Sequence, residues 1–168
     1  MPHLTQLRNL KMARSAHAYV RGSTVQFYDW LHSLPGRRLP NGPAIWICGD
    51  CHAGNLGPTG DNEGRIDMHI RDLDQAVIGN PAHDLVRLAL SLATAARGSD
   101  LPGVTTARML EEMMVGYEQA FKDKPDETPP RPSQVKAGMR NAVARTWKHL
   151  ARERIESARP TIRLGKHF

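Results

Sequence analysis

Apolar residues recur every three or four positions in five stretches of the chain, and this period is typical of amphipathic helices. Gly98 and the pair Pro35-Gly36 follow two of these stretches and indicate where those helices end. Residues 15–22 are predicted to form a break between the first two helices. The expected helices cover about residues 4–12, 23–34, 81–97, 105–122 and 133–156.

Two further stretches have the pattern of short β-strands. Residues 44–48 form an apolar run, and residues 66–70 alternate between apolar and polar side chains. Between them, residues 58–64 (Pro-Thr-Gly-Asp-Asn-Glu-Gly) carry the turn-forming residues of a hairpin. The expected fold class is therefore α+β and mostly helical, with a small β-hairpin that bears the candidate site.

The helix that begins at Pro81 is apolar on nearly every side, so it is expected to be the buried central helix. The methionines of the next helix follow helical spacing and are predicted to be core residues. A charged, proline-rich stretch after them is typical of a linker. The expected organisation is a main block over residues 1–122, a linker over 123–132, and a basic helix and tail over 133–168.

Cysteine content and hydrophobicity predict the cellular compartment of the protein. With two cysteines in one short stretch and no signal-peptide pattern at the N-terminus, we expect a cytoplasmic protein without a disulfide framework. No run reaches the roughly 20 apolar residues of a membrane span, so no membrane partner is expected.

Charge is concentrated in the last part of the chain. Residues 131–168 carry ten lysines and arginines against two glutamates, within a chain of net charge +6. No pattern of aromatic residues interleaved with basic ones accompanies this charge, so nucleic acid is not the expected partner. The basic helix is expected to be a solvated face, or a surface that meets another part of a longer protein or a protein partner.

The residues that can carry chemistry cluster where the two strands end. Asp50 follows Gly49 after the first strand, Asn55 lies five residues further on, and Asp72 and Asp74 follow the second strand. Oxygen ligands of this kind are those that magnesium prefers. An Asp that accepts a hydroxyl proton, beside an Asn and an Asp that hold magnesium, is the minimum equipment for phosphoryl transfer. Paired Asp-rich turns also occur as plain structural turns, so the spacing alone leaves both interpretations open.

Three motifs in this region resemble a known family: Gly-Asp-x-His-x-x-Asn at residues 49–55, Ile-x-Asp-Leu-Asp at residues 70–74, and Gly-Asn-Pro-Ala-His-Asp-Leu at residues 79–85. They look like the catalytic block of the aminoglycoside phosphotransferase and choline kinase branch of the kinase-like fold. More closely, the chain resembles the bacterial family called domain of unknown function 2252. The further matching segments are Lys11-Met12-x-x-Ser15, Arg21-Gly22, Cys48 to Gly57 and Asp84-Leu85-x-Arg87-Leu88-x-x-Ser91.

The resemblance implies the catalytic lobe of a kinase-like fold. It also implies magnesium-dependent transfer of a phosphoryl group from ATP to a small-molecule acceptor of unknown identity. Asp50 would be the catalytic base, and His52 would either touch phosphate or brace the loop. Asn55 and Asp72 would hold magnesium, while Asp74 would be a further ligand or only a loop residue. On this basis Asp50→Ala is expected to abolish transfer and to leave stability nearly unchanged.

Four other residues take supporting roles by the same resemblance. Lys11 and Arg21 would bind the nucleotide cofactor. Asp84 would hold the catalytic loop through backbone N–H groups, or simply cap the helix that it opens, and both roles are compatible. Arg87 would give structural support from the same helix.

The chain departs from the family pattern beside the proposed metal site. Arg71 and Gln75 stand where the family usually has Asn and Glu, which adds a cation and removes a carboxylate. No glycine-rich phosphate loop and no kinase-type Val-Ala-Ile-Lys segment is present in the sequence. Members of the family look longer, so the chain is expected to be a truncated member. A degenerate, non-catalytic kinase-like module is the main alternative.

Two other motifs fit parts of the same stretch. Residues 48–52 match the Cys-x-x-Cys-His attachment motif of c-type haem, although the export signal that haem attachment requires is missing. Asp50-x-His52 followed by residues 79–84 imitates the ligand set of a metallophosphatase. Pro-Ala interrupts the second part of that set, and an apolar helix starts there.

Overall fold

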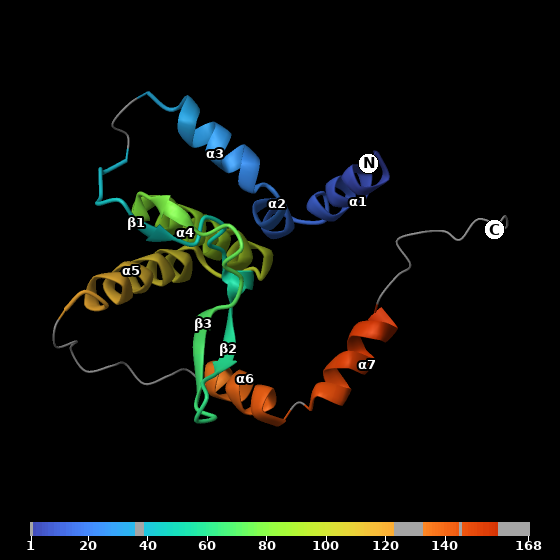
Figure 1. Ribbon diagram of the computed structural model, residues 1–168. Coiled ribbons are helices and arrows are strands. Elements are labelled where there is room, and N and C mark those ends of the chain that lie inside the picture. Colours follow the sequence, from blue (N-terminus) through green and yellow to red (C-terminus); the bar gives the residue numbers. More distant parts are fainter. Residues whose placement is uncertain (1, 36–38, 123–132, 145, 158–168) are drawn as a thin grey trace. The chain divides into compact units, whose positions relative to one another are not determined.

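The computed structural model describes residues 2–35, 39–122, 133–144 and 146–157 (Figure 1). Within these residues the chain is mostly helical with two small sheets, so the α+β class expected from the sequence is confirmed. The helices are α1 (Pro2–Met12), α2 (Ala16–Gly22), α3 (Thr24–Ser33), the 3-10 turn η1 (Ala53–Asn55), α4 (Pro81–Gly98), α5 (Gly103–Gln119), α6 (Ser133–Ala144) and α7 (Trp147–Ser157). The strands are β1 (Ile45–Ile47), β2 (Leu56–Gly60), β3 (Ile66–Ile70) and β4 (Val77–Gly79).

Contacts divide the chain into two compact units, each of which is described by itself. The first comprises Met1–Gly57 and His69–Pro129, and the second comprises Pro58–Met68 and Pro130–Phe168. The expected linker over residues 123–132 lies outside the described residues. Every candidate site residue named above belongs to the first unit.

Helix α4 is the element on which the first unit is built. Helices α2 and α5 both pack against α4, α1 packs on α2, and β1 and η1 also contact α4 (Figure 1). Asn80 caps α4, because its side-chain oxygen accepts a hydrogen bond from Ala82 N at 3.0 Å, and Pro81 occupies the first turn. Among the described residues, the buried apolar side chains are Met12, Val20, Phe27, Ile47, Cys48, Cys51 and Ala96.

The buried face of α4 is largely polar, which corrects the expectation of an apolar central helix. Its buried residues are Arg87, Ser91 and Ala96, and both Arg87 and Ser91 are 0% exposed. The leucines that suggested burial are half-buried, and Leu90 is 43% exposed. The physical reason is that Asp84, Arg87 and Ser91 lie on one face of the helix, and this face meets the polar backbone of a loop.

The methionines of α5 are not core residues either. Met109 and Met113 are half-buried, and Met114 is 41% exposed. Among the described residues α5 packs mainly on α4, so much of its surface stays open to solvent.

Two short sheets lie next to the loop that carries the candidate site. Strand β1 pairs antiparallel with β4, with Ile45 opposite Gly79. Strands β2 and β3 form the hairpin that the turn residues predicted. Asp61 closes that turn by accepting hydrogen bonds from the backbone N–H groups of Glu63 and Arg65 at 3.0 and 2.8 Å. Strand β4 was not expected, because three residues are too few to show a periodic pattern.

The predicted break at residues 15–22 is wrong, because helix α2 occupies this segment. Ser15 caps the helix by accepting a hydrogen bond from Ala18 N at 3.1 Å. At the other end, Met12 packs into the space that a Cβ on Gly22 would occupy. Seven residues give too short a pattern to stand out in the sequence, although the Ser cap was visible.

The single helix predicted over residues 133–156 is also wrong, since α6 and α7 replace it. Thr146 accepts a hydrogen bond from His149 N at 3.3 Å and so caps the first turn of α7. A capping threonine starts a new helix even where the apolar spacing continues across it.

Two glycines with left-handed backbone allow a controlled test of the turn that follows β1. Gly49 has φ +77° and Gly64, in the β2–β3 turn, has φ +78°. A Cβ on Gly49 would overlap the backbone carbonyl of Gln75, whereas a Cβ on Gly64 would have no heavy atom within 4 Å. Both positions disfavour L side chains, but only Gly49 is also sterically closed.

We therefore expect Gly64→Ala to lower the free energy of unfolding by about 1 kcal/mol. Gly49→Ala should lower it by at least about 2 kcal/mol more, because backbone must move. Urea unfolding followed by far-ultraviolet circular dichroism measures both. Equal losses would show that the Gly49 turn is not packed against Gln75.

Candidate functional site

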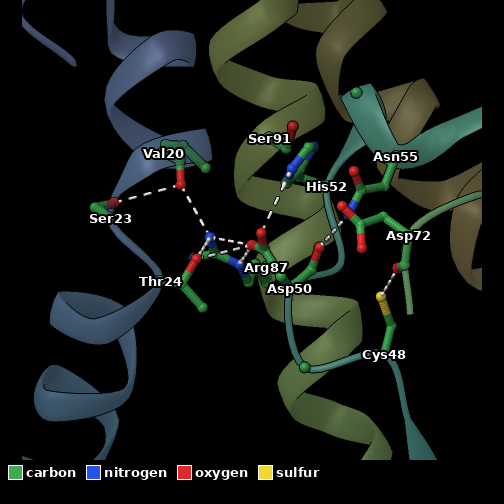
Figure 2. A network of polar contacts seen from close by, with 12 residues as sticks. Val20, Ser23, Thr24, Cys48, Asp50, His52, Asn55, Asp72, Arg87 and Ser91 are labelled. Carbon is green, nitrogen blue, oxygen red and sulfur yellow. Dashed lines mark hydrogen bonds and ion pairs between the residues drawn. The ribbon is translucent and has the colours of Figure 1, made fainter. Parts of the chain in front are cut away.

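The candidate site is the loop from Cys48 to Asn55, which follows β1 and crosses α4 (Figure 2). Asp84 ties the start of this loop to the first turn of α4. Its two carboxylate oxygens accept hydrogen bonds from the backbone N–H groups of Cys48 at 2.6 Å and Gly49 at 3.0 Å. The N-terminal end of a helix also favours a carboxylate at this position through the helix dipole. The loop and the helix start therefore form one rigid corner.

Asp50 pairs with a buried cation (Figure 2). Its Oδ1 accepts hydrogen bonds from Arg87 Nε at 2.9 Å, from Arg87 Nη2 at 2.5 Å and from Thr24 Oγ1 at 2.9 Å. Arg87 Nη2 also donates to Thr24 Oγ1 at 2.7 Å and to Val20 O at 3.1 Å. The guanidinium carbon lies 5.2 Å from the centre of the Phe27 ring, a cation–π contact. Arg87 thus joins α4, the loop, and the corner between α2 and α3.

The second carboxylate oxygen of Asp50 is the one that can meet a reacting group. It lies 3.7 Å from His52 Nε2, which is too long for a hydrogen bond, and the Asp50 side chain is 18% exposed. His52 itself is buried. Burial lowers the pKa of His52; the nearby Asp50 opposes this, and Arg21, Arg87 and His17 add to it. His52 is therefore neutral near pH 7 and supports Asp50 as an uncharged neighbour.

Asn55 and Ser91 fix the far half of the loop. Asn55 Nδ2 donates to the backbone oxygen of Asp50 at 2.9 Å, and Asn55 N donates to His52 O at 2.8 Å. Ser91, buried on α4, accepts a hydrogen bond from Ala53 N at 3.1 Å. These bonds leave Asn55 Oδ1 as the side-chain atom of Asn55 that can bind a cation.

Asp72 and Asp74 lie at the open side of the loop. Arg71 N donates to Asn55 O at 2.9 Å, and Cys48 Sγ donates to Asp72 O at 3.6 Å, so this segment runs along the loop. In Figure 2 the Asp72 carboxylate points toward the side-chain amide of Asn55.

The two carboxyl groups interact with each other. A side-chain hydrogen bond with Asp74 lowers the pKa of Asp72, and the same bond raises the pKa of Asp74. The backbone N–H of Asp74 also donates to Asp72 Oδ1 at 3.4 Å. Two carboxylates this close repel when both are ionised, and a hard cation between them relieves that repulsion.

These donors fit a magnesium ion in kind. Asp72, Asp74 and Asn55 offer oxygen atoms, which magnesium prefers, and the two carboxylates are exposed to solvent. Among the described residues no three His, Cys, Asp or Glu side chains gather closely enough to hold a metal, so the Asn55 amide would have to complete the set. Asp50 is not part of it through Oδ1, since that oxygen is engaged by Arg87.

The two residues expected to bind nucleotide are placed differently. Arg21 lies on α2 and its Cδ is 3.9 Å from the position of a Cβ on Gly54, so it reaches the loop. Lys11 is exposed near the end of α1, and α1 packs on α2. The structure therefore brings Arg21 to the loop, whereas a role for Lys11 remains a prediction.

Sequence reasoning missed three residues that hold the loop: Thr24, Tyr28 and Ser91. Tyr28 donates to Gly49 O at 2.8 Å. Burial first, and then Asp84, raise the pKa of Tyr28 to about 12, which keeps this donor protonated. The signal for Ser91 was visible, since Asp84, Arg87 and Ser91 recur at helical spacing in an apolar helix. Thr24 and Tyr28 carried no signal beyond their own helix.

The remaining motif interpretations meet obstacles in the structure. Cys48 and Cys51 are both buried as free thiols, and burial raises the pKa of Cys51 to about 12, so neither is presented for haem attachment. Asp84, a metallophosphatase candidate, is engaged with backbone N–H groups. His83 packs against the Tyr28 ring, with 6.0 Å between ring centres.

The family can now be stated from comparison with known proteins. A family model described as "Uncharacterized protein conserved in bacteria (DUF2252)" matches residues 1–167. The chain belongs to this family. Neither the curated proteins nor the solved structures give a significant match to this DUF2252 chain. Each of the described helices is too short or too polar to serve as a membrane span.

The buried ion pair changes the expectation for stability in this DUF2252 chain. Removing Asp50 would leave the buried Arg87 without its carboxylate partner, so Asp50→Ala is now expected to lower stability rather than to leave it nearly unchanged. Arg87→Met should lower the free energy of unfolding by about 3–5 kcal/mol. It leaves the Asp50 carboxylate without its partner and removes the hydrogen bonds that join α4 to the loop and to the corner between α2 and α3. Arg97→Met, an exposed arginine in the last turn of the same helix, should change it by less than about 0.5 kcal/mol. Urea unfolding compares the pair, and similar small losses would refute the role of Arg87.

The lowered pKa of His52 predicts how stability depends on pH. The unfolded chain binds a proton at His52 near pH 6.5 and the folded chain does not, so stability should fall as pH drops below about 6.5. In His52→Gln the stability should fall less with decreasing pH than in wild type. In His32→Gln, a change at an exposed histidine, it should fall as much as in wild type. Melting temperatures between pH 8 and 5.5 measure the effect. Parallel curves for all three proteins would contradict it.

Proposed function

We propose that this chain carries the catalytic site of a kinase-like, magnesium-dependent phosphotransferase that moves a phosphoryl group from ATP to the hydroxyl of a small molecule. The observation that carries the proposal is the arrangement of three groups. Asp50 presents one carboxylate oxygen at the loop surface, Asn55 is bonded to the same loop, and the Asp72–Asp74 pair lies along it. This is the equipment that phosphoryl transfer needs.

In the proposed reaction, Asp50 Oδ2 accepts the proton of the acceptor hydroxyl as the hydroxyl oxygen attacks the terminal phosphorus of ATP. The bond between that phosphorus and the oxygen that bridges it to ADP breaks, and ADP leaves. Asn55, Asp72 and Asp74 would hold magnesium, which neutralises charge on the transferring phosphate. Positioning supplies most of the catalysis in such reactions, because the transition state is loose and needs little covalent help.

The surrounding residues have positioning roles in this mechanism. Arg87 and Thr24 hold Asp50 through Oδ1, while Oδ2 lies 3.7 Å from His52 Nε2. Asp84 holds the loop in place at Cys48 and Gly49. His52 braces Asp50 as an uncharged neighbour, and Arg21 lies near enough to the loop to meet the nucleotide phosphates.

A non-catalytic, kinase-like binding module is the second candidate. The contact that favours it is the same Asp50–Arg87 pair, because a buried ion pair can be retained for structure alone. A metallophosphatase would instead hydrolyse a phosphate ester in the presence of manganese without any nucleotide.

Matched aspartate variants test the proposal. Magnesium-dependent release of ADP from ATP should fall at least 100-fold in Asp50→Asn and Asp72→Asn, and should be unchanged in Asp29→Asn, an exposed residue on α3. Because Asp50→Asn weakens the fold, its activity is compared at a temperature where circular dichroism shows it folded. Asp72 is exposed, so Asp72→Asn gives the same test without that complication.

Turnover that survives in both variants would rule out the assigned base and metal ligand. A folded wild-type chain that neither binds magnesium and ATP nor releases ADP would support the binding module. Ester hydrolysis with manganese alone would support the metallophosphatase.

A further inference from the structure

Two exposed arginines from different elements meet at Gly54, next to the loop that carries Asp50. Arg21 approaches from α2, with its Cδ 3.9 Å from the position of a Cβ on Gly54. Arg71 approaches from the segment after β3, and its Nη2 donates to Gly54 O at 3.1 Å. In the described part of the chain the ion pairs involve other groups, and neither arginine pairs with a carboxylate. Two arginine side chains therefore approach one backbone position, and neither forms an ion pair among the described residues.

The Arg71 side chain packs against the backbone of Gly57, where a side chain would displace it. A Cβ on the buried Gly57 would overlap Arg71 Nε and would lie 2.6 Å from its Cζ and 2.7 Å from its Cδ. The Arg71 side chain thus lies directly on the backbone of Gly57, and the bond to Gly54 O fixes its guanidinium. A guanidinium held in this way keeps its other N–H groups for a ligand.

The charges around the two arginines favour an anion. Arg87, the third arginine nearby, is neutralised by Asp50. Asp72 and Asp74 interact with each other and are the proposed magnesium ligands. The buried Nδ1 atom of His52 has no hydrogen-bond partner among the described residues and lies 3.0 Å from the position of a Cβ on Gly54. Arg21 and Arg71, which pair with no carboxylate among the described residues, are therefore the cations open to an anion at this position.

We propose that Arg21 and Arg71 form a clamp over Gly54 that binds the terminal phosphates of the donor nucleotide. Arginine suits this task because its planar fork pairs with two phosphate oxygens at once. The identity of the ligand as a nucleotide rests on the proposed function, whereas binding of a diphosphate group is testable without it.

Isothermal titration with pyrophosphate in the absence of magnesium tests the clamp directly. Wild type should bind pyrophosphate, and Arg21→Met and Arg71→Met should each weaken binding at least tenfold. Arg97→Met removes the same charge from a distant turn of α4 and should change affinity less than twofold.

Gly57→Ala tests the position of the Arg71 guanidinium without removing its charge. The three heavy atoms nearest to its Cβ all belong to the flexible side chain of Arg71, so the variant should fold with nearly unchanged stability and keep every charge. Its affinity for pyrophosphate should nevertheless fall at least fivefold. Unchanged affinity in Gly57→Ala together with Arg71→Met, or an equal loss in Arg97→Met, would overturn the clamp. Absence of pyrophosphate binding by wild type would overturn it as well.

The pyrophosphate titrations and the ADP-release assay together distinguish the clamp from the transferase. Pyrophosphate binding that depends on both arginines, without any magnesium-dependent ADP release, would retain the clamp and reject the transferase. Magnesium-dependent turnover that is indifferent to Arg21→Met and Arg71→Met would retain the transferase and reject the clamp.

Discussion

The ion pair between Arg87 and Asp50 is the interaction on which the first unit depends. Burying a guanidinium is costly, and here Asp50, Thr24 and the carbonyl of Val20 offset the cost through hydrogen bonds. Each of these partners lies on a different element, so the pair forms only when α2, α3, α4 and the loop have come together. In a domain with few fully buried apolar side chains among its described residues, such a contact specifies the arrangement more sharply than hydrophobic burial does.

The sequence predicted the fold class, most helix positions and the loop that bears the candidate site. It did so because those features are local: caps, glycines and apolar spacing within about 20 residues. The polar interior of α4 could not be predicted in the same way. Arg87 and Asp50 are 37 residues apart, and Thr24 and Asp50 are 26 apart, so no local pattern reports their pairing. Apolar spacing also continued across Thr146, where a cap divides α6 from α7.

In the candidate site, the residues that hold the loop in place differ from the exposed residues at its open side. Residues that face α4 hold the loop mainly through its backbone: Asp84 binds two N–H groups, Ser91 binds one, and Tyr28 binds a carbonyl. Asp72 and Asp74, by contrast, are exposed to solvent. Backbone-directed support leaves the exposed side chains open to change without loss of loop geometry.

The contact between Gly57 and Arg71 has an evolutionary consequence. A side chain at position 57 and a long side chain at position 71 compete for the same volume, so the two positions are not independent. Among relatives, a residue larger than glycine at 57 should accompany a short residue at 71, and arginine at 71 should accompany glycine at 57.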